Sequence, residues 1–143
     1  MTKGKDPRQE ILEVKMPYIS GLSSNHYKFF GGRYTKPEVK DWMLALKEEI
    51  YIMGLKNLLN RTPQVKVFIS GTFKDKRSCP DIHNLVKIIL DSIAPALGMN
   101  DRDIEVNTGI PKIVKREYGI FCSRKVNLQA TGEILIKLER ILL

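Results

Sequence analysis

A helix predicted over residues 81–94 carries an unusual set of polar residues. At about 100° per residue, four of them fall within one arc of roughly 100° and the opposite side is hydrocarbon; the four are His83, Asn84, Lys87 and Asp91. Solvated helix faces are mostly Glu, Lys, Gln and Arg, so this stripe is a candidate active site. Two structural roles compete with that interpretation. Asp81 could be only the N-cap, and Lys87 with Asp91 could be an i, i+4 pair contributing about 0.2–0.5 kcal/mol.

Acidic residues also follow this helix, immediately before a predicted strand. Asp101 and Asp103 lie there beside Asn100. A turn rich in Asn and Asp is normally only a turn. Acids at both ends of one helix in a basic protein nevertheless suggest a site for a hard cation with oxygen ligands. A basic surface combined with carboxylates that hold Mg²⁺ or Mn²⁺ is what phosphodiester hydrolysis requires.

The composition predicts one globular domain over residues 1–143. The chain has 24 Lys and Arg against 16 Asp and Glu, a formal charge of +8, with 43% hydrophobic residues. Polyanions are natural partners because basic side chains release condensed counterions on meeting phosphates, although many basic proteins bind nothing charged. Two cysteines make no disulfide framework and lack zinc-site spacing, which favours a reducing, cytoplasmic location. No apolar run approaches the ~18 residues of a membrane span, so no membrane association is expected.

The periodicity of the chain predicts an α+β fold. Strands are expected over residues 10–16, 64–73, 104–108, 112–117 and 133–141. Two main helices, one from residue 35 or 36 to about Leu59 and one over 81–94 ending near Pro95 and Gly98, should pack on the sheet. The sheet is expected to be small and mixed or largely antiparallel.

Two segments are candidates for phosphate contact. The long irregular stretch 17–36 combines aromatic and basic groups that suit stacking and backbone binding, and a short basic loop follows the strand predicted to end at residue 73. The expected DNA-binding residues are Asn25, Tyr27, Arg33, Lys36, Lys74, Lys76 and Arg77.

In layout, residues 11–141 resemble the RusA-type Holliday junction resolvases. The specific part of the resemblance is Arg77, Asp81-Ile82-His83-Asn84-Leu85, Lys87, Asp91 and Asn100-Asp101. The resemblance implies a RusA-like enzyme that resolves branched DNA, a four-way junction, by phosphodiester hydrolysis. Such an endodeoxyribonuclease depends on Mg²⁺ or Mn²⁺ and needs no organic cofactor.

Carried over position by position, the resemblance assigns roles to single residues. Catalytic roles fall to Asp81, Lys87 and Asp101, and supporting roles to Asn84 and Asp91. Two positions depart from the pattern, because His83 replaces an aspartate and Asn100 replaces an acid. An imidazole ligand accepts Mn²⁺ more readily than Mg²⁺. The expected metal ligands are therefore Asp81, His83, Asp101 and, as a substitute, Asp103.

The missing acids leave two other classes of function open. One is a non-catalytic basic DNA-binding protein with a degenerate metal site, and the other is a protein whose basic face contacts RNA or an acidic partner.

Geometry adds a constraint on the metal site. A helix over residues 82–94 is roughly 20 Å long, so Asp81 and Asp101 begin at opposite ends of it. Residues 95–101 can span about 23 Å when fully extended, so within one chain nearly all of them would have to run back along the helix to bring Asp101 to Asp81. Two antiparallel copies would bring Asp101 beside Asp81 more easily, which predicts shared sites in a homodimer.

Overall fold

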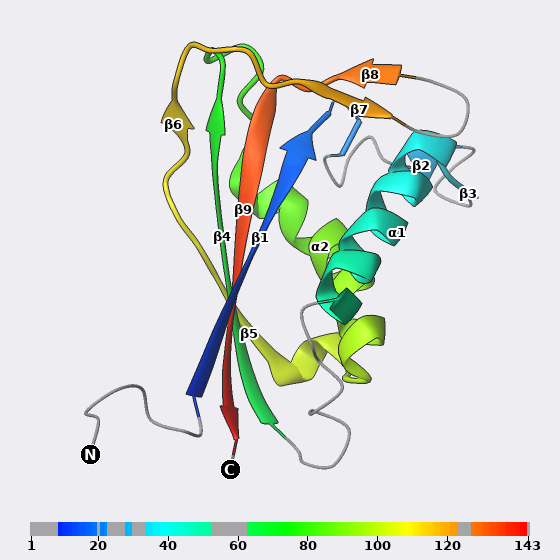
Figure 1. Ribbon diagram of the computed structural model, residues 1–143, viewed down its shortest axis with the longest axis vertical. Coiled ribbons are helices and arrows are strands. Elements are labelled where there is room, and N and C mark those ends of the chain that lie inside the picture. The colour runs from blue at the N-terminus through cyan, green and yellow to red at the C-terminus, as the bar shows by residue number, and fades with distance from the viewer. Residues whose placement is uncertain are drawn as a thin grey trace.

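The computed structural model of the chain describes residues 9–19, 21–22, 28–29, 34–52, 63–122 and 127–142. Figure 1 shows a twisted sheet with two helices packed on one side. The strands of this sheet are β1 (Gln9–Tyr18), β4 (Pro63–Phe73), β5 (Ile104–Thr108), β6 (Lys112–Ile113) and β9 (Gly132–Leu142). The remaining elements are β2 (Lys28–Phe29), β3 (Tyr34–Thr35), α1 (Pro37–Ile52), η2 (Ile82–Leu85), α2 (Val86–Leu97), η3 (Asp101–Asp103), β7 (Ile120–Cys122) and β8 (Asn127–Gln129).

The main sheet is mixed. Its order is β1-β9-β4-β5, and β6 pairs with β4 beyond the end of β5. Strand β9 runs antiparallel to both β1 and β4, whereas β5 and β6 run parallel to β4. The predicted α+β class, with a small mixed sheet and two main helices, is therefore confirmed. A homodimer stays a prediction.

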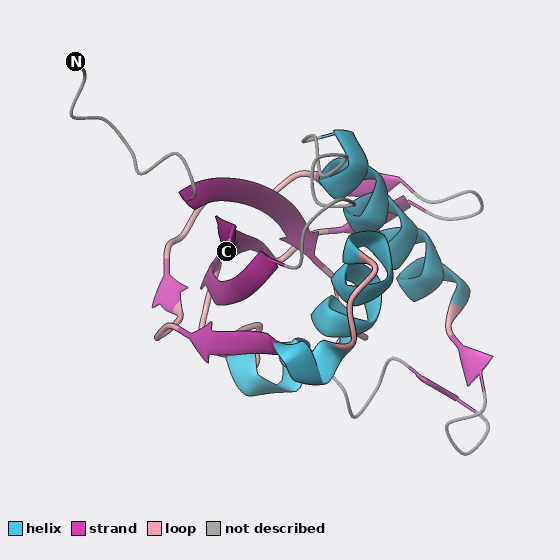
Figure 2. Ribbon diagram, turned by 90° about the horizontal axis from the view of Figure 1, so that it is seen from below, coloured by secondary structure: helices cyan, strands magenta, loops and turns pink. Residues whose placement is uncertain are grey.

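The core lies between the sheet and the helices, and Figure 2 shows from below that the helices lie on one side of the sheet. Strand side chains alternate between faces, so β4 buries Val65, Val67 and Ile69 toward the helices and leaves Lys66 and Phe68 on the open face. The helical residues of this core are spaced by three or four, as an amphipathic helix requires. They include Trp42, Leu46 and Ile50 of α1 and Leu85, Ile89 and Ile93 of η2 and α2.

Several predicted boundaries need correction. The second helix begins as the 3₁₀ turn η2 and continues through Pro95 to Leu97, where Gly98 with φ 66° ends it. A proline is tolerated in a last turn because only one carbonyl, that of Asp91, loses its helical donor. The strand predicted over 112–117 is shorter, because Val114 bonds to the carbonyl of Phe73, the last residue of β4. The predicted end of the first helix near Leu59 lies outside the described residues.

None of the helices within the described ranges has the length and apolar character that crossing a membrane requires.

Candidate functional site

Asp81 caps the helical segment at the end where the candidate site lies. Its backbone is extended (φ −72°, ψ 120°), and its Oδ1 accepts the backbone N–H of His83 at 3.0 Å. The Asp81 carbonyl accepts the N–H of Asn84 at 2.9 Å, which starts the 3₁₀ turn. The N-cap role considered from the sequence is therefore present, and it leaves both Asp81 and His83 exposed.

Asp81 and His83 line an open cavity of about 270 Å³. The opposite wall is the segment between β5 and β6. The full lining is Asp81, Ile82, His83, Thr108, Gly109, Ile110 and Pro111. The cavity thus lies between the N-terminal end of the helical segment and the C-terminal end of β5. Ligands of open α/β sheets commonly bind at the carboxyl ends of the strands.

A bulge in the sheet edge shapes the cavity wall. The pairing Ile69 with Thr108 and Thr72 with Lys112 leaves two residues of β4 opposite the three residues 109–111. Gly109 anchors the bulge by donating its N–H to the Ile69 carbonyl at 2.8 Å. A Cβ at this position would lie 2.8 Å from the Phe68 ring, so glycine allows the close approach.

Cations from two segments meet at the same end of the sheet. Lys74, Lys76 and Arg77 follow β4 directly, and the register places β6 beside the last residues of β4. We call this group the basic end, and it comprises Lys74, Lys76, Arg77, Lys112, Lys115 and Arg116, all of them exposed. The turn of Lys74 to Ser78 carries the first three of these cations, and Asp81 follows three residues after Ser78.

Asp75 holds that turn in shape. Its Oδ1 accepts the Ser78 backbone N–H at 2.7 Å. This hydrogen bond is the main cause that lowers the pKa of the Asp75 carboxyl, and Lys74 and Arg77 lower it further. The carboxylate therefore stays ionised and fixes the turn from which three cations project.

The acids after the helix lie elsewhere. Asp101 and Asp103 form η3, immediately before β5, whereas the cavity contacts Thr108 at the far end of that strand. Asp103 and Thr108 are five residues apart, which is about 16 Å along an extended strand. Within the part of the chain that the structure describes, no three His, Cys, Asp or Glu residues are grouped to hold a metal ion. One chain does not assemble the predicted ligand set, and sharing between two copies stays a prediction.

The remaining predicted site residues are placed as follows. Lys87 Nζ lies 3.6 Å from Asp91 Oδ2, with 61% of the lysine side chain exposed, so these two form the helix pair considered from the sequence. Asn84 is half-buried, and Asn100 caps η3 by accepting the Arg102 N–H at 3.2 Å. Lys36 directly precedes α1. Asn25, Tyr27 and Arg33 lie outside the described residues.

Sequence reasoning missed the cavity wall and half of the basic end. The unrecognised residues are Thr108, Gly109, Ile110, Pro111, Lys112, Lys115 and Arg116. A strand followed by a helix and a second strand commonly forms a parallel crossover, and that pattern in residues 64–108 could have indicated that β5 lies beside β4.

Comparison with known proteins yields little. No family model and no curated protein matches the chain. Among solved structures, IspF of Plasmodium falciparum in a CDP complex covers 94% of this chain and 96% of its own at 13% identity, with a TM-score of 0.38. A 2C-methyl-D-erythritol-2,4-cyclodiphosphate synthase covers 94% and 99% at 12% identity, with a TM-score of 0.36. Similarity at this level assigns neither fold nor activity to this chain.

These results correct the family prediction. No family model supports a RusA-type resolvase, and the two solved structures named above belong to another class of protein. The prediction of a RusA-type, Mg²⁺- or Mn²⁺-dependent endodeoxyribonuclease acting on Holliday junctions is therefore wrong, and so is branched DNA as its partner. The comparisons do not test the alternative of a non-catalytic basic DNA-binding protein with a degenerate metal site, which stays a prediction.

Proposed function

We propose that the basic end binds the phosphate groups of a polyanionic ligand beside the Asp81 cavity. The observation that carries the proposal is the register of β6 on β4, which joins Lys112 and its neighbours to the cations after Phe73. Lysine and arginine provide charge-assisted hydrogen bonds to phosphate oxygens, which are about twice as strong as neutral ones. Because the cations lie on an exposed surface rather than inside a deep cleft, the site suits an extended ligand.

The proposal includes a divalent cation, which Asp81 and His83 would bind together with phosphate oxygens of the ligand. Mg²⁺ is commonly held by one or two carboxylates together with phosphate oxygens of the ligand, so a site with few protein ligands is completed when the ligand arrives. An imidazole ligand shifts the preference toward Mn²⁺. Asp81 keeps a second carboxylate oxygen beyond the one that caps the helix. The cation would neutralise phosphate charge at the cavity mouth.

Calorimetric titration with inorganic polyphosphate tests the proposal. The test variant carries Lys74→Gln, Arg77→Gln and Lys112→Gln. A matched control carries Lys15→Gln, Lys40→Gln and Lys47→Gln, which remove the same charge from β1 and α1. Affinity should fall by about tenfold or more in the first variant and only slightly in the control. Equal losses in both would show a net-charge effect and refute a defined site.

A further inference from the structure

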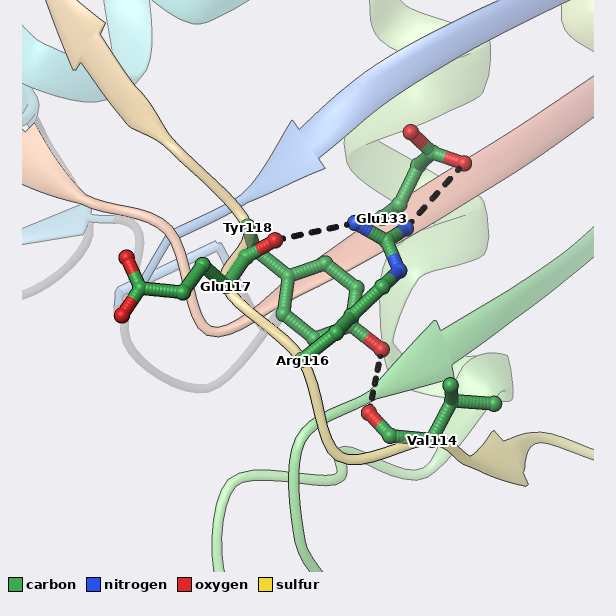
Figure 3. Close-up of polar contacts among 5 residues, drawn as sticks. All are labelled: Val114, Arg116, Glu117, Tyr118 and Glu133. Carbon is green, nitrogen blue, oxygen red and sulfur yellow. Dashed lines mark hydrogen bonds and ion pairs between the residues drawn. The ribbon is translucent and has the colours of Figure 1, made fainter.

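Arg116 and Tyr118 form a stacked pair next to the basic end. The guanidinium carbon of Arg116 lies 3.8 Å from the centre of the Tyr118 ring. The Tyr118 hydroxyl donates to the Val114 carbonyl at 2.7 Å, which fixes the ring under the guanidinium (Figure 3). A planar cation over a ring face is a favourable arrangement.

Two further contacts hold the guanidinium plane. One of its terminal nitrogens, Nη2, lies 3.7 Å from Glu133 Oε1, and the other, Nη1, donates to the Glu117 carbonyl at 3.1 Å. The Arg116 side chain nevertheless keeps 44% of its surface exposed. Tyr118 covers one face of the guanidinium, and the contacts to Glu133 and Glu117 are made by its terminal nitrogens. None of these contacts uses the opposite face, which we call the open face of Arg116.

The pair is close to the cations of the proposed phosphate site. Glu133, which holds Arg116, is the register partner of Thr72 on β4. Thr72 is in turn the partner of Lys112 on β6. Adjacent strands lie about 4.8 Å apart, so Glu133 and Lys112 are separated by roughly 10 Å across the sheet. That separation is within the reach of a few linked nucleotides.

We infer that the open face of Arg116 stacks an unpaired base of a single-stranded nucleic acid whose phosphates lie on the basic end. This inference rests on the proposed function and names its ligand class. Guanidinium planes and aromatic rings are the platforms on which proteins stack unpaired bases. A duplex covers the base faces by its own stacking, so only a single strand can offer one.

A simpler role for the pair is to fasten residues 114–119 to β9. Fluorescence anisotropy separates the two roles with labelled ten-nucleotide strands of dT, of rU and of abasic sites carrying the same phosphates. The wild type should bind the base-containing strands about five- to a hundredfold more tightly than the abasic strand. The dT and rU strands distinguish DNA from RNA as the source of the base.

Arg116→Lys keeps the charge and removes the plane. It should abolish most of the preference for bases, measured as the ratio of the affinity for the base-containing strands to that for the abasic strand. Lys115→Gln is the matched control, and it should weaken the base-containing and abasic strands equally. Tyr118→Leu removes the ring but keeps Arg116, so it should also lose the preference, and it serves if Arg116→Lys does not fold.

Failure of the inference is distinguishable from failure of the proposed function. If the wild type binds dT, rU and abasic strands equally, or if Arg116→Lys weakens all three alike, stacking is refuted while phosphate binding stands. If the wild type binds polyphosphate but no oligonucleotide, the inference alone is refuted. If it binds neither, both are refuted.

Discussion

Gly109 donates its backbone N–H to the carbonyl oxygen of Ile69 at 2.8 Å, and this bond fixes the bulge that faces Asp81 across the cavity. The two sides of the cavity come from segments that the chain joins through η2, α2 and η3. The position of the cavity wall opposite Asp81 therefore depends on this hydrogen bond at the edge of the sheet.

Two glycines of the sheet should respond differently to alanine. A Cβ at Gly109 would approach the far end of the Phe68 ring, which is 40% exposed and can move. A Cβ at Gly132 would lie 2.4 Å from the buried Phe73 ring and 2.6 Å from the Thr72 carbonyl, which is fixed backbone. We expect Gly109→Ala to cost about 1 kcal/mol of unfolding free energy and Gly132→Ala about 3 kcal/mol or more. Urea denaturation measures both, and a larger loss for Gly109→Ala would contradict this packing.

Tyr18 should make stability fall at alkaline pH. Its ring packs edge-on against Phe73 at 5.2 Å, and burial is the main cause that raises its pKa above the ordinary 10.0, with Cys79 adding to the effect. The unfolded chain therefore releases this proton first, so the contribution is fully present below pH 10 and is lost as the pH rises through the folded value. Melting temperatures of Tyr18→Phe should decline less than those of the wild type between pH 9 and 11. Tyr51→Phe, on the exposed side of α1, is the control and should follow the wild type.

Within a single chain, Asp81 should contribute to the binding of a divalent cation and Asp101 should not. Asp81→Asn keeps a capping oxygen for the His83 N–H and removes the charge, so the fold should persist. We expect Asp81→Asn to abolish the strengthening of polyphosphate binding by Mn²⁺ and Asp101→Asn to leave it intact. Calorimetry with and without Mn²⁺ measures this. If both variants lose the effect, Asp101 reaches the site, as the predicted shared dimer site would require.

Salt dependence should count the cations that contact phosphate. For a single strand, the slope of log affinity against log salt changes by about 0.7 per phosphate contact. The variant lacking Lys74, Arg77 and Lys112 should therefore have a slope shallower by about 2 on the abasic strand. Unchanged slopes, measured by anisotropy between low and moderate salt, would mean that these three side chains do not contact the phosphates.

The sequence predicted most of the fold because the strong signals are local. Residues 104–108 were predicted with their observed limits, since an Asn- and Asp-rich turn precedes them and Gly109 follows. The second helix was expected to end near Pro95 and Gly98, and of these two residues Gly98 caps it. The hairpin of β7 and β8 was missed because its strands are three residues long.

The site was less predictable because its parts meet only through strand register. Lys112 lies beside the cations that follow Phe73 because it pairs with Thr72. Residues 109–111 face Asp81 because of a one-residue bulge, which the periodicity of the sequence does not indicate. The family prediction was wrong for a different reason, which is that polar residues with local structural roles can produce the same motif. Asp81 caps a helix, Lys87 pairs with Asp91, and Asn100 caps η3. Each of these polar residues has a local structural role that produces the same pattern of residue types.

The most direct test of phosphate binding at the basic end is an NMR titration of isotope-labelled protein with inorganic polyphosphate. The account predicts that amide shifts concentrate at residues 74–78, 81–84 and 108–117, on both sides of the cavity. Shifts concentrated instead on α1 or on the open face of the sheet around Phe68, or no shifts at all, would contradict it.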